Sequence, residues 1–286
     1  MQSALSQQAH EILEKYWGYK QFREKQEEII LSVLEGKDTL ALLPTGGGKS
    51  ICFQVPAMCM EGICIVVSPL IALMKDQVEN LKKRNISAYA IFSGMSRREI
   101  DVTLDHCVYG KVKFLYVSPE RLQTEIFQER LKKMKVSLLA IDEAHCISQW
   151  GYDFRPPYLQ IAEIRKLIPQ VTCIALTATA TEVVKGDIQD RLQFRTQRKV
   201  VQKSFSRANL SYSCFYEENK TQKLLQILKN VPGSAVIYAN TRKRVQEIAK
   251  ILVQYKINAD FYHAGLGNEE RNRKQDAWIK NKTRII

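Results

Sequence analysis

Two stretches of the sequence have residue types and spacing that suit a nucleoside triphosphate. The first, residues 44–50, reads PTGGGKS and follows the apolar run TLALL. Glycines let backbone N–H groups approach phosphate oxygens, a lysine reaches the β- and γ-phosphates, and a serine hydroxyl binds Mg²⁺. Position 43 is leucine where the strict P-loop pattern has glycine, so a glycine-rich turn without function is the alternative. We expect phosphate binding by Thr45, Gly46, Gly47, Gly48, Lys49 and Ser50, with the Ser50 hydroxyl also at the metal.

The second stretch, residues 136–156, reads VSLLAIDEAHCISQWGYDFRP. Its apolar start is typical of a buried parallel strand, and Asp142 and Glu143 follow where open α/β sheets bind ligands. We predict that Asp142 holds Mg²⁺, directly or through water, and that Glu143 orients or deprotonates the attacking water. DEAH is a weak motif by itself, but together with the upstream PTGGGKS it indicates a nucleotide hydrolase.

The residues after DEAH form an aromatic-rich loop. Trp150, Tyr152, Phe154 and Arg155 surround Gly151, a composition that suits stacked nucleic-acid bases. Buried packing of Trp150 and Phe154 is the alternative, but the glycine and the polar neighbours favour an exposed functional loop. Because this loop directly follows the carboxylates, a change at the nucleotide site could alter the loop, and a change in the loop could alter the nucleotide site.

The segment WGYKQFREKQ near the start of the chain suits an adenine ring. The side-chain amide of Gln26 can pair with N6 and N7 of adenine, and Tyr19 and Arg23 could hold the ring between them. Taken alone, the segment would favour simple core packing of Tyr19 and Phe22.

Strands alternate with helices over residues 37–191, which predicts right-handed βαβ units and a parallel sheet. Two expected strands end in SPL and SPERL, and a third leads into TATAT. The hydroxyl side chains at these ends face the ligand edge, where they could hold a nucleic-acid backbone; for the two serines, ordinary N-caps are as good an explanation. The hydroxyl residues concerned are Ser68, Ser118, Thr177 and Thr179, and Pro69 beside Ser68 is predicted to share their DNA-binding role. We expect strands at 39–43, 63–67, 114–117, 136–141 and 171–176, and helices at 5–16, 24–34, 51–58 and 70–83.

A second α/β unit is expected after a polar, basic stretch at 195–210. We place the boundary near Ser206, which gives domains at 1–205 and 206–286. In the second domain we expect strands at 210–216, 234–238 and 257–261 and helices at 221–228, 245–252 and 269–279.

Composition is that of a folded protein with an excess of positive charge. The 286 residues are 45% hydrophobic and 26% charged, with a net charge of +13 and a pI near 9.4. This charge favours a polyanionic partner, with a solvated basic surface as the alternative. Seven cysteines form no CxxC pair, show no zinc-ligand spacing and suggest reduced core thiols. With no signal peptide and no membrane-spanning run, we expect a cytoplasmic protein, nucleoid-associated if bacterial.

Taken together, the motifs resemble those of RecQ-family DNA helicases in helicase superfamily 2. GYKQFREKQ, PTGGGKS, VVSPLIALMKDQV, YVSPERL, DEAHCISQWGYDFRP and LTATA are similar to that family's ordered motifs, and the loop after DEAH is the most specific. The resemblance implies a RecA-like P-loop domain with a parallel sheet flanked by helices, followed by an incomplete second RecA-like domain. It also implies ATP and Mg²⁺ as cofactors, with 3′-to-5′ translocation on single-stranded DNA and unwinding of tailed duplex DNA, in repair or recombination.

By the same resemblance, particular residues take particular roles. Tyr19, Arg23 and Gln26 hold adenine. His145 and Gln149 relay between nucleotide and loop, and Trp150, Phe154 and Arg155 sense or grip single-stranded DNA. In the second domain, Asn240 and Arg242 of IYANTR and His263 of YHAGL lie where a DNA backbone is held; a structural histidine is an equal alternative for His263.

The sequence stops at KTRII, at the start of an expected strand. The resemblance places the remaining helicase motifs, an arginine that reaches ATP, and zinc-binding and winged-helix domains beyond this point. We therefore expect a fragment or truncated product that binds ATP and unwinds little. The alternatives are an RNA helicase or RNA-dependent ATPase, which would grip the 2′-OH, and a non-catalytic module that binds ATP and DNA.

Overall fold

The computed structural model describes residues 2–151, 153–204 and 209–286. The chain divides into two compact units, Met1–Arg207 and Ala208–Ile286. The predicted boundary residue, Ser206, lies outside the described residues.

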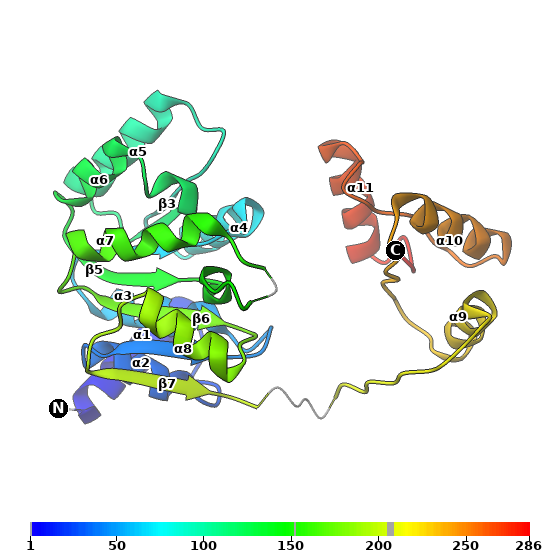
Figure 1. The fold of residues 1–286 in the computed structure, drawn as a ribbon, viewed down its shortest axis with the longest axis horizontal. Helices are drawn as coiled ribbons and strands as arrows, with labels where there is room; N and C mark the ends of the chain where they lie inside the picture. Colours follow the sequence, from blue (N-terminus) through cyan, green and yellow to red (C-terminus); the bar gives the residue numbers. More distant parts are fainter. Residues whose placement is uncertain (1, 152, 205–208) are drawn as a thin grey trace. The chain divides into compact units, whose positions relative to one another are not determined.

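A seven-stranded parallel sheet forms the centre of the first unit, in the order β3-β4-β2-β5-β6-β1-β7 (Figure 1). All residues of β1, β2, β4 and β6 are buried, because helices cover both faces of the sheet. The predicted parallel α/β fold is confirmed. The strands are β1 (Asp38–Leu42), β2 (Ile63–Val67), β3 (Ala88–Ile91), β4 (Phe114–Val117), β5 (Val136–Ile141), β6 (Thr172–Thr177) and β7 (Arg198–Gln202).

Alternate residues of every strand except β7 enter separate cores on the two faces. Leu40 and Leu42 of β1 belong to one core, whereas Ala41 and Leu43 belong to the other. Helices α5 (Arg97–Tyr109), α6 (Glu125–Leu131), α7 (Ile161–Leu167) and α8 (Glu182–Arg191) contribute to the first core. Helices α2 (Gln26–Leu34), α3 (Lys49–Cys59) and α4 (Ile71–Lys82) contribute to the second, and α1 (Gln2–Trp17) packs on α2 and α3. Short 3₁₀ helices are η1 (Pro119–Arg121), η2 (Ala144–Ile147) and η3 (Pro156–Gln160).

None of the helices described is long and apolar enough to span a lipid bilayer.

Two edge strands differ from the sequence-based expectation. Strand β3 was not expected, and β7 lies inside the stretch 195–210 that we interpreted as a polar connection. In β7 only Val201 is buried, so the strand has almost no apolar signal. It forms because its backbone pairs with β1 over five residues, from Asp38–Arg198 to Leu42–Gln202.

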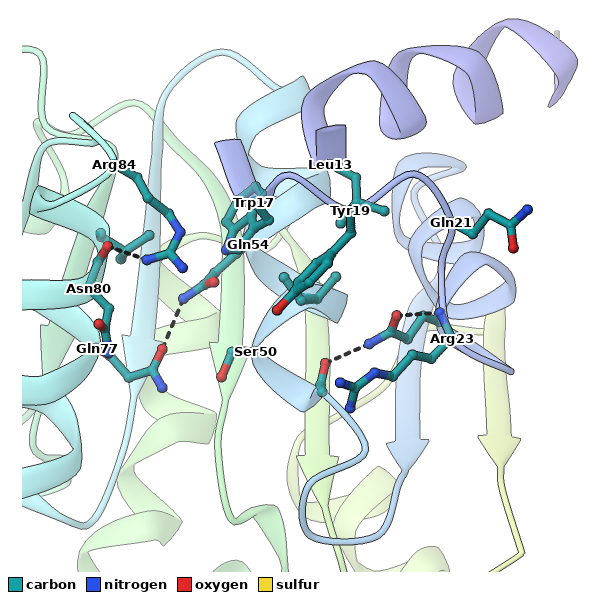
Figure 2. A pocket seen from close by; sticks show the side chains of 14 residues that line it. Leu13, Trp17, Tyr19, Gln21, Arg23, Ser50, Gln54, Gln77, Asn80 and Arg84 are labelled. Carbon is teal, nitrogen blue, oxygen red and sulfur yellow. Dashed lines mark hydrogen bonds between the residues drawn. The ribbon is translucent and has the colours of Figure 1, made fainter. Parts of the chain in front are cut away.

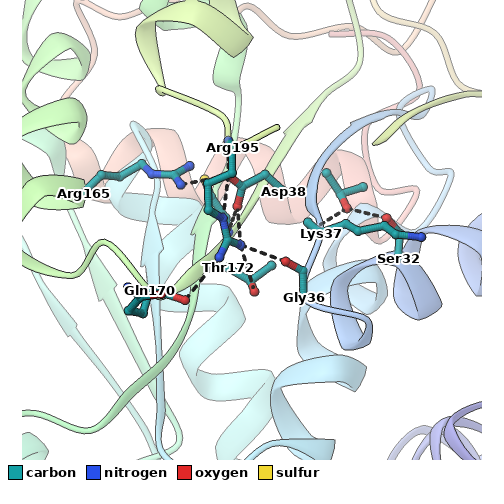
Figure 3. Close-up of polar contacts among 10 residues, drawn as sticks. Ser32, Gly36, Lys37, Asp38, Arg165, Gln170, Thr172 and Arg195 are labelled. Atoms are coloured by element: carbon teal, nitrogen blue, oxygen red, sulfur yellow. Dashed lines mark hydrogen bonds and ion pairs between the residues drawn. The ribbon is translucent and has the colours of Figure 1, made fainter. Parts of the chain in front are cut away.

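A buried carboxylate fixes the end of the sheet at which β1 and β6 begin (Figure 3). Asp38 is fully buried and accepts hydrogen bonds from the backbone N–H of Cys173 at 2.9 Å and of Arg195 at 2.8 Å. The guanidinium groups of Arg165 and Arg195 lie 2.9 and 3.0 Å from its oxygens. Arg195 also donates to the backbone oxygen of Gly36 at 2.9 Å, so the segment before β7 is tied to the start of β1.

The second unit contains the three predicted helices, but the predicted strands are wrong. Residues 210–216 form no strand, and 234–238 and 257–261 contribute only isolated bridges, from Ala235 and Ala259 to Ile285. The backbone bonds around Ile285 cover too few residues for a ladder, and a small core of Leu228, Leu252 and Ile285 holds the unit. The helices are α9 (Lys220–Asn230), α10 (Arg242–Gln254) and α11 (Asn268–Ile279).

Candidate nucleotide and nucleic-acid site

The carboxyl ends of the parallel strands bring the predicted motifs to one edge of the sheet. The P-loop, residues 44–48, follows β1, and Asp142 follows β5, while β6 lies between these two strands. The backbone N–H of Leu43 donates to the oxygen of Thr177 at 3.1 Å, and that of Asp142 donates to Val67 at 2.8 Å. The phosphate motif and the carboxylates therefore share the edge where open α/β sheets bind ligands, as predicted.

Two positions of the P-loop require glycine, Gly47 because of close approach to backbone and Gly48 because of its positive φ. A Cβ at Gly47 would lie 2.8 Å from the backbone oxygen of Pro44, and one at Gly48 would lie 2.3 Å from Nε2 of Gln26. Gly48 also has a positive φ of 77° and immediately precedes α3. Lys49 and Ser50 form the first turn of that helix, so backbone N–H groups and the positive end of the dipole are directed at the loop.

A cavity of about 370 Å³ joins the predicted adenine and phosphate residues (Figure 2). Tyr19, Arg23, Gln26, Gly48 and Ser50 all line it. Tyr19 is 54% exposed, so it is not a core residue and its ring is free to stack on a base. The cavity thus brings together five of the residues predicted for ATP, whereas Thr45, Gly46, Gly47 and Lys49 are not among its lining residues.

Gln26 contacts the P-loop instead of standing free in the cavity. Its Nε2 donates to the backbone oxygens of Gly47 at 3.3 Å and Gly48 at 3.1 Å, and its Oε1 accepts from the N–H of Arg23 at 2.8 Å. The guanidinium of Arg23 donates to the oxygen of Gly46 at 2.7 Å. The predicted bidentate contact of Gln26 with adenine stays a prediction, and it requires these bonds to rearrange.

The two carboxylates after β5 lie in an electrostatically unfavourable arrangement. Glu143 has a left-handed backbone, with φ 48°, and its N–H donates to Oδ1 of Asp142 at 3.0 Å. Burial, and then the negative charge of Glu143, raise the pKa of Asp142 to about 6, while Lys49 lowers it. A divalent cation would offset both effects, so Asp142 and the Ser50 hydroxyl fit the oxygen-ligand set of Mg²⁺.

His145 links the carboxylates to β6. Its Nδ1 lies 2.8 Å from the hydroxyl of Thr177 and 3.3 Å from Oε2 of Glu143. Because the Thr177 hydroxyl donates its proton to the oxygen of Thr179 at 3.1 Å, Nδ1 of His145 is the donor in their bond. Burial lowers the pKa of His145, so the ring is neutral near pH 7 and acts as a hydrogen-bonding link.

The aromatic-rich loop carries an exposed indole. Trp150 is 75% exposed, which excludes core packing, whereas Phe154 is partly buried. Arg155 pairs with Asp153 at 3.0 Å and donates to the backbone oxygen of Pro69 at 3.3 Å. The loop is therefore tied to the SPL segment, and Tyr152 lies outside the described residues.

Other predicted residues at this edge are less well placed for the roles assigned to them. The side chain of Gln149 is exposed and makes no hydrogen bond to any residue within 2–151, 153–204 or 209–286. The hydroxyls of Ser68 and Ser118 are buried, have no partner among the described residues and cap no helix. As placed, these two hydroxyls cannot contact a DNA backbone. Thr179 is exposed beside Trp150, where a cavity of about 370 Å³ lies between them.

Two buried polar residues of the site were not identified from the sequence. Gln54 of α3 donates to Gln77 of α4 at 3.0 Å and to the hydroxyl of Tyr116 of β4 at 3.2 Å. Tyr158 donates to the backbone oxygen of Asp142 at 2.9 Å. A glutamine on the apolar face of helix ICFQVPAM was the available signal for Gln54, but nothing in the sequence pointed to Tyr158.

The second unit brings its three predicted residues to one cavity of about 560 Å³. Asn240 and Arg242 are exposed at the start of α10. His263 places Nε2 3.1 Å from Nε2 of Gln246, and its Nδ1 is buried without a partner among the described residues. Contact with a DNA backbone stays a prediction for these residues.

Comparison with known proteins agrees with these motifs. The family model described as DEAD/DEAH box helicase matches residues 23–186. The ATP-dependent DNA helicase RecQ of Pasteurella multocida (strain Pm70) is 39% identical over 283 residues, covering 99% of this chain and 45% of that protein. The RecQ of Bacillus subtilis (strain 168) is 41% identical over 281 residues, covering 97% of this chain and 47% of that one. The chain thus spans about half the length of these relatives.

A solved structure, that of the DUF1998 helicase MrfA, has a similar fold. Its TM-score is 0.69 at 18% identity, over 97% of this chain and 45% of the other. At this identity the likeness concerns the fold alone.

Proposed function

Because the chain belongs to the DEAD/DEAH box helicase family, we propose that it couples ATP hydrolysis to movement along single-stranded DNA, as a RecQ-type helicase does. The similarity to two RecQ proteins supports DNA as the nucleic acid. The proposed cofactors are ATP and Mg²⁺, and the proposed substrates are single-stranded and tailed duplex DNA. The proposed direction is 3′ to 5′.

One connected set of contacts carries this proposal. The Thr177 backbone accepts from Leu43 beside the P-loop, its hydroxyl accepts from His145, and His145 lies 3.3 Å from Glu143. The exposed Trp150 follows on the same segment of chain. A displacement at the nucleotide can therefore reach the loop proposed to bind DNA through residues that touch one another.

The P-loop and the two carboxylates after β5 take different roles in hydrolysis. The backbone N–H groups of the P-loop and the Lys49 ammonium hold the phosphates in position for in-line attack. Glu143 accepts a proton from, or orients, the attacking water, and its contact with His145 fixes the carboxylate. Asp142 and Ser50 would hold Mg²⁺, which neutralises charge on the phosphates when bound.

ATP turnover with different polynucleotides tests the proposal. We expect single-stranded DNA to stimulate hydrolysis and RNA of the same sequence to do so far less. An RNA-dependent ATPase would give the opposite order, and a non-catalytic module would bind ATP without turnover. Strand separation on 3′-tailed and 5′-tailed duplexes tests the 3′-to-5′ direction. We expect only the 3′-tailed duplex to be opened.

A pair of aromatic substitutions locates the DNA contact. Trp150 and Tyr109 are both 75% exposed, but Tyr109 lies at the end of α5, away from the proposed site. Stacking contributes about 1–3 kcal/mol per base, so Trp150→Ala should weaken DNA binding by about 5- to 150-fold. Tyr109→Ala should leave it unchanged. Equal effects of the two substitutions, with both variants folded by circular dichroism, would remove Trp150 from the DNA site.

A further inference from the structure

Three side chains with different metal-ligand atoms meet where η2 faces the loop that follows it. A ring nitrogen of His145, Sγ of Cys146 and a carboxylate oxygen of Asp153 all lie within 4.8 Å of one another. His145 and Cys146 are buried, and Asp153 is partly buried. Nitrogen, sulfur and carboxylate oxygen are the ligand types of Zn²⁺, whereas Mg²⁺ prefers oxygen alone.

We propose that His145, Cys146 and Asp153 form a binding site for Zn²⁺, separate from the proposed Mg²⁺ site at Ser50 and Asp142. In a tetrahedral zinc site, bond lengths near 2.3 Å to sulfur and 2.0 Å to oxygen place these two ligand atoms about 3.5 Å apart. Sγ of Cys146 and Oδ2 of Asp153 are 3.7 Å apart, already close to this separation. The His145 nitrogen must approach by at most about 1.5 Å, which side-chain rotation can supply.

Backbone hydrogen bonds hold the ligands across the loop. The N–H of Arg155 donates to the oxygen of Cys146 at 2.8 Å, and that of Ser148 donates to His145 at 3.2 Å. A Cβ at Gly151 would lie 2.8 Å from the oxygen of His145, so the loop approaches η2 this closely only with glycine there. The cavity lined by His145, Trp150 and Gly151 reaches the cluster at one of its three members, the His145 side chain.

Binding of zinc would change the partners of the loop. The carboxylate of Asp153 would turn from Arg155 to the metal, and one proton would leave the Cys146 thiol as the thiolate forms. His145 would then be joined to the loop by a metal bond, so Glu143 and the loop could no longer adjust independently. Zinc should therefore suppress the DNA stimulation of ATP hydrolysis; this regulatory effect rests on the proposed function, whereas metal binding does not.

Cobalt provides a spectroscopic test on the whole chain. Co²⁺ is titrated into the protein without Mg²⁺, under a phosphine reductant. We expect one ion per chain, with tetrahedral d–d bands and a thiolate-to-cobalt charge-transfer band, all displaced by Zn²⁺. Cys146→Ser should abolish the charge-transfer band, whereas Cys214→Ser, at an exposed cysteine of the second unit, should retain it. Failure of the folded wild type to bind, or a band that persists in Cys146→Ser, would overturn the site.

Two substitutions of aspartate, one in the proposed site and one outside it, test the proposal even if Cys146→Ser folds poorly. Asp153→Asn removes a ligand and should weaken Co²⁺ binding at least about tenfold. Tenfold is the lower end of the loss in metal affinity seen when a residue that only hydrogen-bonds to a metal ligand is replaced. Asp101→Asn also removes a carboxylate paired with an arginine, Arg130 at 2.8 Å, and should change nothing. Equal Co²⁺ affinity in the two variants would contradict the proposal.

The regulatory effect is measured separately. Zn²⁺ should inhibit DNA-stimulated hydrolysis at least about tenfold more strongly in the wild type than in Cys146→Ser, matching the expected loss of affinity. Equal inhibition would overturn the regulatory role. If DNA does not stimulate hydrolysis at all, the proposed function fails, and the cobalt spectra still decide whether the metal site exists.

Discussion

Thr177 accepts a hydrogen bond from Nδ1 of His145 on its hydroxyl, at 2.8 Å, and another from Leu43 on its backbone oxygen, at 3.1 Å. One residue of β6 thus touches both the strand that leads into the P-loop and the histidine after the carboxylates. Thr177→Val keeps the shape and the backbone contact but leaves Nδ1 of His145 without this partner. We expect DNA-stimulated ATP hydrolysis to fall by about tenfold, the kinetic equivalent of about 1.4 kcal/mol from a lost buried hydrogen bond. Thr103→Val, at a buried threonine of α5, is the matched control and should retain full stimulation.

Substitutions of Lys49 and Glu143 should impair different steps, ATP binding in the first case and ATP cleavage in the second. Lys49→Ala removes the positive charge at the phosphates, so ATP binding should weaken and hydrolysis should nearly stop. Glu143→Gln keeps the side-chain shape and removes the proton acceptor, so nucleotide should be retained without being cleaved. Fluorescent-nucleotide binding and single-turnover hydrolysis separate the two results. Unimpaired hydrolysis in either variant would contradict the site assignment.

Gln26→Ala tests whether the glutamine reads the base or supports the P-loop. Its amide donates to the oxygens of Gly47 and Gly48, so we expect the variant to lose affinity for ATP, GTP and CTP alike, by about 3- to 10-fold for a net hydrogen bond or two. Base choice should relax in addition. Gln21→Ala, at an exposed residue on the rim of the same cavity, is the control. A loss confined to ATP would show that base reading is the whole role of Gln26.

Gln54→Leu should separate ATP binding from the response to DNA. Its buried amide joins α3, which follows the P-loop, to α4, which follows the SPL segment, and to β4, which leads into the SPERL segment. The variant should still bind ATP through the P-loop, even though Gln54 lines the same cavity, but ATP should no longer change its affinity for single-stranded DNA. Tyr116→Phe removes only one of the two partners and should give an intermediate effect. Fluorescence anisotropy of labelled DNA with and without a non-hydrolysed ATP analogue measures this, and an unchanged response in Gln54→Leu would exclude the link.

Asp38→Asn should destabilise the first unit without altering the nucleotide edge. Burial by itself raises the pKa of Asp38, but hydrogen bonds from Arg195, Cys173 and Arg165 outweigh it and hold the pKa below its usual 3.8. Because the folded-state pKa is depressed, the stabilisation is complete above 3.8 and is lost as the pH falls through the folded pKa. Leaving two arginines without their carboxylate should cost about 3–5 kcal/mol at neutral pH.

Urea unfolding at several pH values checks this. The difference in unfolding free energy between wild type and Asp38→Asn should be full at neutral pH. It should shrink as the pH falls below 3.8 and through the lower folded-state pKa, because the wild-type carboxyl then becomes protonated and loses its charge. A gap independent of pH would show that the loss comes from packing and not from charge. ATP affinity at neutral pH should match the wild type under conditions where both are folded.

The elements predictable from sequence were those whose own residues are buried. The runs at 63–67 and 136–141 match β2 and β5 residue for residue, because each is apolar and bounded by turn or polar residues. Strand β7 could not be found in this way, since its single buried residue, Val201, leaves no pattern and its pairing comes from the backbone of β1. The strands predicted in the second unit failed for the opposite reason: their apolar residues were present, but the described backbone makes only isolated bridges.

Within the site, sequence identified residue types better than their partners. Motif spacing placed Lys49, Asp142 and Glu143 on one edge, because parallel strands all end there. The bonds of Gln26 to the P-loop depend on how α2 lies against it, and the buried hydroxyls of Ser68 and Ser118 depend on how their loops fold back. Such features arise from tertiary packing, and no local pattern records them.

The pairing of β7 with β1 also has a mechanical consequence. The chain leaves β7 at Lys203, whose N–H still bonds to the oxygen of Leu42, and the other end of the strand is anchored where Arg195 meets Asp38. A pull on Lys203 directed along the strand would load this parallel ladder lengthwise, so that its hydrogen bonds share the force and do not open one by one. Strand β7, which lies beside the strand that leads into the P-loop, can therefore bear tension along its length.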